Sequence, residues 1–444
     1  MAVSPRKVLY VSHNHPAIRP GGAEAYAFEL HEAMRDESDW ESLFLARTGP
    51  PFSTSSRYHE GTLLTGVDDG DPGQYFFYTE LGDFDWLLNS TREKSTITTH
   101  FREFLRAQRP DVVHFQHTLF IGLEAIREVR NTLPDAALVY TLHEFLPICH
   151  RHGQMLRATD EEPCLEESPR RCHECFPEVA PQEFFMRKRF IQSQLELVDL
   201  FVAPSKQLRD RYVDWGLPPE KVMVEEYGRL PLPYEPGSPR RKKRNRFGFF
   251  GQFSHYKGVN VVLQAARRLA EDEVDATIYL HGANLEIQPP EFQEEFAALL
   301  EESGERVVMI GRYDHDQLGS LMEAVDYVLV PSRWWENSPL VIQEAFMHGR
   351  PVICSDIGGM AEKVADGVDG LHFRVGDPED LARVIAQAAG SAQLWRTLAG
   401  GIEPVYPMRA HVEELLRVYE GLLAGEPEPA APPAEEGLTI GAAP

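Results

Sequence analysis

The segment from residue 336 to residue 344 reads ENSPLVIQE and has a glutamate at each end. A short apolar run, YVLV at residues 327–330, precedes it and predicts a buried parallel strand. Ser338 can cap a helix and Pro339 suits a first helical position, so a helix is expected to begin there. Glu336 then lies in a loop at the carboxyl end of a strand, where open α/β sheets bind ligands.

The second glutamate, Glu344, falls more than one turn into the expected helix, where its carboxylate can accept hydrogen bonds from a sugar diol. The backbone N–H groups from Ser338 to Val341 form the positive end of that helix and suit a phosphate. One strand-loop-helix unit could thus hold a ribose, a diphosphate and a second sugar. The alternative is an ordinary strand-loop-helix unit in which the carboxylates of Glu336 and Glu344 are simply solvated.

The length and composition of the chain predict two domains in a soluble protein. At 444 residues the chain exceeds one typical core, and 43% hydrophobic residues supply material for two. The 69 acidic residues outnumber the 44 basic ones and give a formal net charge of −25. Such a charge argues against a nucleic-acid partner, although a local basic patch could still attract phosphate.

We expect a cytoplasmic protein, at most peripheral to the inner face of a membrane. The apolar run at residues 8–11 is too short for the core of a signal peptide, and no segment approaches the length of a membrane span. The basic run from Arg240 to Arg246 contains six cations. It could draw the protein to anionic lipid, or it could be a solvated interdomain hinge.

Strands alternate with helices along the chain, which predicts an α/β fold with doubly wound parallel sheets. A helix is expected from Gly21-Gly22 to about Arg35, and the segment 47–95 is expected to form long loops with short elements. Strands are expected at residues 8–11, 111–115, 137–143, 200–205, 247–251, 277–281, 307–311, 327–330 and 351–354.

Four prolines within residues 231–239, followed by the basic run, interrupt this pattern and predict a linker. The expected organisation is an amino-terminal Rossmann-like domain at 1–230, a linker at 231–246, a carboxyl-terminal Rossmann-like domain at 247–405, a closing helix at 406–423 and a disordered tail at 424–444.

A second glycine-rich loop, GQFSHYKG at residues 251–258, follows a predicted strand and opens a helix near Val259. Its glycines allow close backbone approach, and Lys257 can bring a point charge to a phosphate. A structural turn is the alternative, but two such loops in one domain favour phosphate binding. Gly358 and Gly359 begin a third helix. Close packing of that helix on the sheet would also explain this pair of glycines.

The first half carries candidate groups at the ligand edge of its own sheet. Gly21-Gly22 make a glycine-rich helix start without the G-x-G-x-x-G spacing of nicotinamide and flavin enzymes. His117 and His143 each follow a predicted strand, so both are expected at that edge, in a functional or a structural role. The absence of a Gly-x-Ser-x-Gly elbow and of a Walker loop argues against a serine hydrolase and a P-loop NTPase.

Four cysteines, Cys149, Cys164, Cys172 and Cys175, have the spacing C-x14-C-x7-C-x2-C. The last pair has zinc-knuckle spacing, and a cytosolic cluster of this kind favours metal over disulfide. The options are a structural zinc ion, free thiols, and an iron–sulfur cluster or disulfide. A zinc site would brace the insertion at 149–175 beside the cleft.

Together these motifs resemble the retaining nucleotide-sugar glycosyltransferases of family 4, also called group 1. The resemblance covers the chain to about Leu423 and is strongest from Gly248 to Asp380. It implies the GT-B fold, in which two Rossmann-like domains face each other across a cleft, with the acceptor on the amino-terminal side. It also implies a UDP- or GDP-sugar donor, a glycan, lipid-linked glycan or small-molecule acceptor, and no cofactor required for catalysis.

The resemblance further implies a role for each matching residue. In the carboxyl-terminal half, Glu336 would contact the transferred sugar, Glu344 would hold the ribose diol, and Lys257 would neutralise the diphosphate. The backbone amides of Leu340 and Val341 would assist that lysine.

Other matches are less direct. Gln252 stands where the family usually has an arginine, so Lys257 or Arg312 is a candidate to supply the missing charge. In the amino-terminal half, Gly22 would approach the donor, His117 would lie near the sugar hydroxyls, and His143 matches the histidine of the Thr-x-His element in the next strand. We therefore expect catalytic roles for both histidines, together with Glu336 and Lys257.

The implied reaction is departure of a diphosphate from an anomeric carbon, with cations and helix amides stabilising its charge and with retention of configuration. Two alternatives remain open from the sequence. One is a phosphorylase-like or hydrolysing enzyme on the same fold. The other is a metal-dependent interaction protein that keeps the fold and uses the cysteine segment as its working surface.

Overall fold

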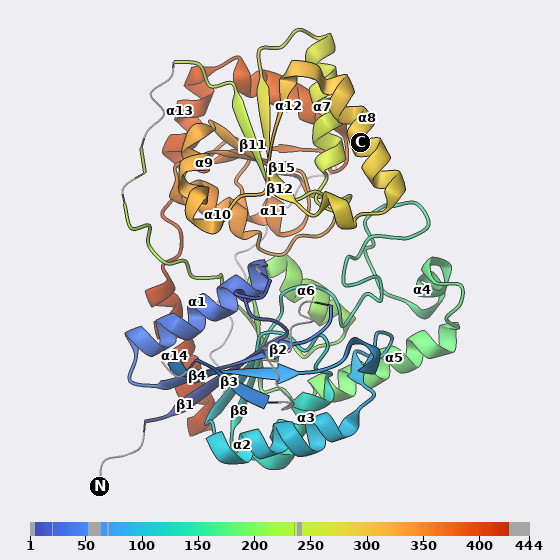
Figure 1. The fold of residues 1–444 in the computed structure, drawn as a ribbon, viewed down its shortest axis with the longest axis vertical. Coiled ribbons are helices and arrows are strands. Elements are labelled where there is room, and N and C mark those ends of the chain that lie inside the picture. Colours follow the sequence, from blue (N-terminus) through green and yellow to red (C-terminus); the bar gives the residue numbers. More distant parts are fainter. Residues whose placement is uncertain are drawn as a thin grey trace, which may run out of the picture.

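The computed structural model describes residues 5–19, 21–51, 64–68, 71–234, 236–237 and 242–425. It has two α/β domains, one in the lower half and one in the upper half of the view (Figure 1). The prediction of two parallel-sheet domains is confirmed. The predicted disordered tail lies outside the described residues from residue 426 onward, as do Arg240 and Arg241 of the basic run.

The sheet of the amino-terminal domain has the order β10-β9-β8-β7-β1-β2-β4-β3. Its described strand pairs are parallel except β3 with β4. The strands are β1 Lys7–Ser12, β2 Glu41–Thr48, β3 Leu64–Asp68, β4 Asp71–Tyr78, β7 Val112–Phe115, β8 Ala137–Thr141, β9 Leu200–Ala203 and β10 Val222–Val224, beside a small hairpin of β5 Phe84–Asp85 and β6 Ser90–Thr91.

The prediction of long loops at 47–95 misses β4, which pairs with β2 inside this sheet. Its first residues, Asp71-Pro72-Gly73, carry turn chemistry that masks the strand pattern behind them. β2 itself, just before that segment, was also not predicted, although it is almost wholly buried.

Helices cover both faces of this sheet, and each face has its own apolar core. Helices α2, α3, α5 and α6 contribute to one core, and α1 and α14 contribute to the other. The helices of this domain are α1 Gly22–Glu37, a π-helical turn Thr96–Phe101 that continues into α2 Arg102–Gln108, α3 Glu124–Thr132, α4 Pro169–Cys175, α5 Pro181–Leu195 and α6 Lys206–Trp215, with 3-10 turns at Leu81–Asp83 and Pro219–Lys221.

The sheet of the carboxyl-terminal domain has the order β13-β12-β11-β14-β15-β16, with parallel pairs throughout its described strands. Its strands are β11 Arg246–Gln252, β12 Thr277–Ala283, β13 Val307–Gly311, β14 Tyr327–Val330, β15 Val352–Ser355 and β16 Gly370–Phe373. The central strand β14 is buried along its whole length, as a strand covered on both faces should be.

Helices α7, α8, α12 and α13 pack on one face of this second sheet, and α9, α10 and α11 pack on the other. They are α7 Val259–Glu271, α8 Pro290–Ser303, α9 Leu318–Ala324, α10 Leu340–Met347, α11 Gly358–Lys363, α12 Pro378–Ala389 and α13 Ala392–Gly401, with 3-10 turns at Leu285–Ile287, Gly304–Arg306 and His315–Gln317.

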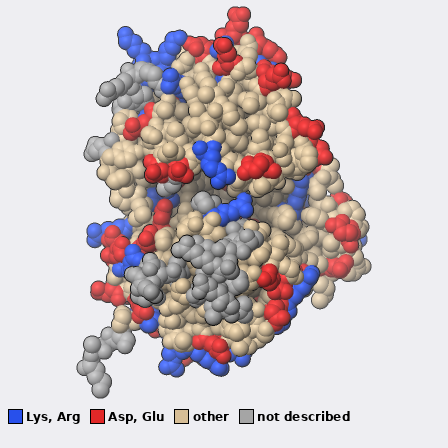
Figure 2. Space-filling view, viewed as in Figure 1, with Lys and Arg blue, Asp and Glu red and all other residues tan. Residues whose placement is uncertain are grey.

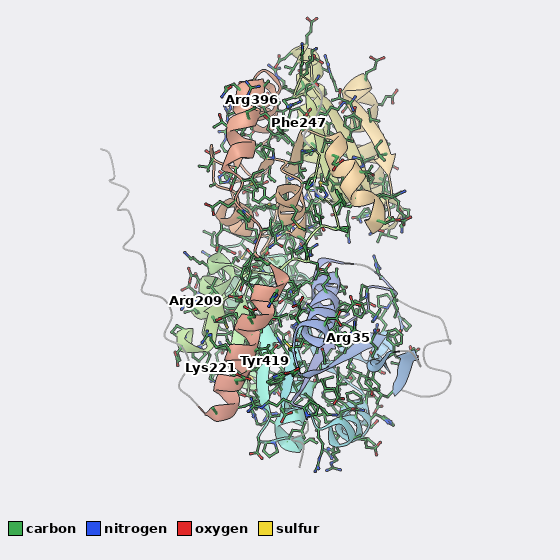
Figure 3. The ribbon with its side chains drawn as sticks, turned by 90° about the vertical axis from the view of Figure 1, so that its left-hand side faces the viewer. Arg35, Arg209, Lys221, Phe247, Arg396 and Tyr419 are labelled. Carbon is green, nitrogen blue, oxygen red and sulfur yellow. The ribbon has the colours of Figure 1, made fainter. Side chains whose placement is uncertain are left out.

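The chain crosses between the domains twice, because α14 (Met408–Ala424) returns to the amino-terminal domain. Figure 3 shows Tyr419 on α14 beside the first domain, far from Phe247 in the second. The Tyr419 hydroxyl bonds His114 on β7 (2.6 Å). Among the described residues, no helix combines the length and the apolar character that a membrane crossing requires.

Candidate active site

The two glutamates of the starting segment flank the beginning of α10, close to the expected position. The helix begins at Leu340, and Pro339 occupies the N-cap with an extended backbone. Ser338 does not cap the helix as predicted. Its hydroxyl donates instead to the Glu226 carboxylate of the first domain (2.9 Å), since a charged acceptor outcompetes a weaker cap contact.

Glu336 is 6% exposed and lies in a small network of donors. Its Oε1 accepts from the Ser332 hydroxyl (2.7 Å) and the Trp334 indole N–H (3.1 Å), and it forms an ion pair with the Lys257 ammonium. The glutamate and the lysine named from the sequence therefore meet.

Two glycines allow the loops of this site to approach one another. Gly258 has φ +71°, and a Cβ there would lie 1.9 Å from the carbonyl oxygen of Pro331. A Cβ on Gly359 would lie 1.5 Å from the carbonyl oxygen of Asn337, and the N–H of Gly359 donates to the Glu336 carbonyl (2.7 Å). The paired glycines at 358–359 thus serve close contact with the Glu336 loop, and not only helix–sheet packing.

Glu344 lies on α10, at the boundary between the domains. Its Oε1 is 3.5 Å from Nη2 of Arg229, which lies shortly before the linker. Burial, and to a lesser degree the charge of Glu344, raise the pKa of Tyr313. Across the boundary, a Cβ on Gly22 would touch the Leu340 side chain at 3.8 Å. The starts of α1 and α10 therefore face each other.

A pair of imidazole–carboxylate contacts occupies the carboxyl edge of the first sheet. His117 Nε2 lies 3.3 Å from Glu144, and His13 Nε2 lies 3.1 Å from Glu24 in the first turn of α1. The rings of the two histidines are 4.4 Å apart. Burial, and then the neighbouring His13, lower the pKa of His117, while Glu144 acts in the opposite direction.

Both ring nitrogens of His143 are engaged. Nε2 lies 2.9 Å from Oε1 of Gln116, an atom that can only accept, so Nε2 carries the proton. Nδ1 then accepts from the Tyr227 hydroxyl (2.5 Å). Burial lowers the pKa of His143 well below its usual range. The geometry thus makes His143 a neutral member of the cleft wall.

Asn337 joins the two domains, and sequence reasoning did not single it out. Its Oδ1 accepts from the Ser205 hydroxyl (2.7 Å), and its Nδ2 donates to the carbonyl oxygens of Leu142 (3.3 Å) and His143 (3.4 Å). His13, Glu24 and Glu144 were missed as well. The signal for His13 was its place directly after a strand, and the signal for Glu24 was its place beside the paired glycines.

Two of the predicted donor-binding side chains, those of Arg312 and Gln252, are exposed. Arg312 follows β13, is 70% exposed at its side chain and pairs with Glu286 (3.7 Å). Gln252 ends β11 as an exposed residue. Backbone positions Leu340 and Val341 lie in the first turn of α10, as expected.

The cysteine insertion extends to the glycine-rich loop of the second domain. Glu161 forms an ion pair with His255, and the Arg151 guanidinium lies 5.7 Å from the centre of the Tyr256 ring. Arg151 also holds Glu161 (2.8 Å). These contacts tie the insertion to the loop that carries Lys257.

The four cysteines of the insertion are free thiols of intermediate exposure. Cys149 and Cys164 pack against the core of the first domain, while Cys172 and Cys175 lie on α4. Within the described part of the chain, no group of three or more His, Cys, Asp or Glu side chains is arranged to hold a metal ion. Zinc binding here stays a prediction.

On the face shown in Figure 2, Lys and Arg side chains gather around a hollow between the two domains, with Asp and Glu at its flanks. The whole chain carries an excess of negative charge.

Comparison with known proteins identifies the family. The model described as Glycosyltransferase Family 4 matches residues 20–224, and the model described as Glycosyl transferases group 1 matches residues 234–394. The chain belongs to the group 1, family 4 glycosyltransferases.

Among curated members of this glycosyltransferase family, a D-inositol 3-phosphate glycosyltransferase of Catenulispora acidiphila is 29% identical over 245 residues, which are 51% of this chain and 58% of that protein. A glycogen synthase of Thermus thermophilus is 30% identical over 165 residues, 34% of this chain and 36% of that protein. The matches thus span less than two thirds of these relatives.

Solved glycosyltransferase structures share the fold over nearly the whole chain. A sucrose-phosphate synthase from Thermosynechococcus elongatus has a TM-score of 0.70 at 17% identity, covering 95% of this chain and 100% of that one. HepE of Anabaena, solved with UDP and glucose, has a TM-score of 0.64 at 17% identity, covering 94% and 100%. These similarities confirm the predicted GT-B fold.

Proposed function

We propose that the protein transfers a sugar from a nucleoside diphosphate sugar, with UDP or GDP as the nucleotide, to a hydroxyl of a glycan, a lipid-linked glycan or a small molecule, with retention of configuration. The observation that carries this proposal is the pairing of Lys257 with Glu336 beside the first turn of α10. A cation, a carboxylate and free helix N–H groups converge there, as a diphosphate sugar requires.

In this proposal the donor spans the start of α10. The diphosphate binds Lys257 and the amides of Leu340 and Val341, the ribose diol binds Glu344, and the transferred sugar lies against Glu336. Gly22 approaches from the first domain without a side chain, which leaves room for the donor. HepE, a structural neighbour, was solved with UDP-glucose, which supports a nucleotide-sugar donor.

Catalysis would come from electrostatic stabilisation of the leaving diphosphate and from positioning. Lys257 and the helix amides oppose the negative charge that grows on the leaving oxygen. His117 and His143 are neutral and hydrogen-bonded in the cleft wall, so they would orient sugar hydroxyls rather than carry protons far. No step needs a cofactor.

A thermal-shift screen with UDP, GDP, ADP and their glucose conjugates tests the proposal. At least one nucleotide should raise the melting temperature, and the matching labelled donor should pass its sugar to an acceptor with an unchanged anomeric configuration, read by NMR. Release of free sugar or sugar phosphate alone would identify a hydrolase or phosphorylase instead. The metal-dependent interaction protein is not favoured, because the family match covers both domains.

A further inference from the structure

The Arg229 guanidinium is buried where the two domains meet. The residue is 7% exposed, and its two terminal nitrogens contact carboxylates from opposite domains. Nη1 lies 3.1 Å from Glu29 on α1, and Nη2 lies 3.5 Å from Glu344 on α10. One cation is therefore shared by a helix of each domain.

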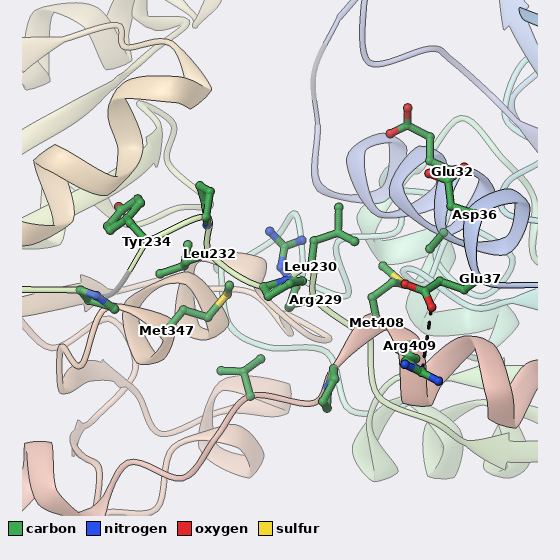
Figure 4. Close-up of a pocket in the computed structure, with 16 residues that line it drawn as sticks. Glu32, Asp36, Glu37, Arg229, Leu230, Leu232, Tyr234, Met347, Met408 and Arg409 are labelled. Carbon is green, nitrogen blue, oxygen red and sulfur yellow. Dashed lines mark ion pairs between the residues drawn. The ribbon is translucent and has the colours of Figure 1, made fainter.

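The main chain of Arg229 belongs to the crossing itself. Its N–H donates to the carbonyl of Tyr406 (2.9 Å), and its carbonyl accepts from the N–H of Met408 (2.8 Å). The chain that leaves the first domain and the chain that returns to it are thus bridged at this residue. Figure 4 shows Arg229 between α1, with Glu32, Asp36 and Glu37, and Met347 of α10, beside a groove of about 910 Å³.

These contacts constrain Glu344 in a particular way. The guanidinium is rigid and planar, and its contact with one oxygen of Glu344 (3.5 Å) restrains the position of that carboxylate. Each carboxylate oxygen has two lone pairs, so an Oε1 that accepts from Arg229 can still accept from a hydroxyl. The ion pair therefore orients Glu344 without blocking it.

We infer that Arg229 is a positioning residue for the nucleotide. It presents the Glu344 carboxylate to the two ribose hydroxyls. Arg229 itself does not touch the nucleotide. The inference rests on the proposed function, in which Glu344 holds the ribose diol.

The test compares ribose and dideoxyribose nucleotides by calorimetry. The nucleotide that binds more tightly, UDP or GDP, is chosen first. It is then compared with its own 2′,3′-dideoxy form. Wild-type protein should prefer the ribonucleotide at least about tenfold, since a hydroxyl bonded to a charged group is lost in the other form. Glu344→Ala should reduce this preference to near one.

Arg229→Met should reduce the preference to the same extent, and the double variant should show no further change. Glu29→Gln is the matched control, because it removes the other carboxylate partner of Arg229 and should leave the preference for ribose intact. A purely structural arginine would lower the affinity for both forms in equal proportion and leave their ratio unchanged.

If Arg229→Met keeps the wild-type preference for the ribonucleotide while Glu344→Ala loses it, the inference is overturned. If Arg229→Met does not fold, as judged from its melting temperature, Arg229→Lys decides. Its ammonium is a point charge on a flexible stem and does not hold the Glu344 carboxylate in one position, so the ratio should fall at least about threefold, and an unchanged ratio again overturns the inference. Absence of nucleotide binding by the wild type is a different result, which refutes the proposed function itself.

Discussion

Lys257 and Glu336 form an ion pair within the carboxyl-terminal domain, between two loops 79 residues apart. The lysine is the cation proposed to meet the diphosphate, and the glutamate is the carboxylate proposed to meet the sugar. A bound diphosphate would compete with Glu336 for the same ammonium. Donor binding should therefore release the carboxylate at the moment the sugar arrives beside it.

The first prediction concerns Lys257. Lys257→Met removes the cation beside the developing charge and should lower the transfer rate on the order of 10²–10³, measured with saturating labelled donor. Arg312→Met is the control, because Arg312 is 70% exposed and pairs with the exposed Glu286. A strong defect in the Arg312 variant with near-normal turnover in the Lys257 variant would reverse the assignment.

The second prediction separates the two glutamates. Glu344→Ala should weaken the binding of free nucleotide by roughly 1.5–3 kcal/mol for each lost hydrogen bond to the carboxylate. Glu336→Gln should bind free nucleotide at least as tightly as the wild type, because the competitor for the Lys257 ammonium loses its charge, and it should transfer sugar slowly. Calorimetry and initial rates on the same preparations check both parts, and equal nucleotide affinity in the Glu344 variant would rule out its ribose role.

The third prediction is a pH dependence. Burial alone would raise the pKa of Glu24, but the charge and hydrogen bond of His13 outweigh it and lower the pKa to about 2. A carboxyl whose pKa is lower in the folded state stabilises the fold above its unfolded pKa, and this contribution is lost as the pH falls toward 2. Chemical denaturation between pH 5 and pH 3 should show a steeper loss of stability for wild type than for Glu24→Gln. Parallel curves would mean that the ion pair with His13 does not contribute.

The fourth prediction concerns the contact between the cysteine insertion and the second domain. Glu161→Gln removes the charge opposite His255 and should reduce transfer by up to about fivefold, the scale of a partly exposed ion pair. Glu162→Gln, at the exposed neighbouring carboxylate, should behave like wild type. Equal rates in all three proteins would show that this contact does not help to hold the Lys257 loop.

The fifth prediction is one zinc ion per chain in protein purified without chelator. Its physical reason is that the segment around Cys164, Cys172 and Cys175 has little apolar content, so a tetrahedral metal would supply missing organisation. Elemental analysis measures it, with Cys172→Ser/Cys175→Ser expected to lose the metal and the buried Cys354→Ser expected to keep it. Four titratable thiols in the insertion without zinc or iron would contradict the prediction.

Local chemistry was sufficient to predict five of the six described strands of the second domain, all except β16, and the loops that carry Lys257 and Glu336. In each case an apolar run ends at a glycine or at a helix start, and these signals lie within a few residues of each other. The same approach failed for Ser338, because its partner Glu226 lies 112 residues away in the other domain. It also missed Arg229, whose two carboxylate partners, Glu29 and Glu344, lie on helices of different domains. Contacts between the domains produce no pattern in the local sequence. The part of the site that depends on these contacts was therefore not predictable.

The return of α14 to the first domain has a consequence for how the protein is made. Met408, Val412, Leu415, Val418 and Tyr419 complete an apolar core that also contains Tyr10 and Tyr26. More than four hundred residues must therefore be synthesised before the face formed by the first strand and first helix can be covered. During translation that face stays open to solvent and to chaperones while the second domain emerges and folds. Cutting the chain between the two family matches would yield a first half with an unfinished core, so the two halves are structural units but not separable ones.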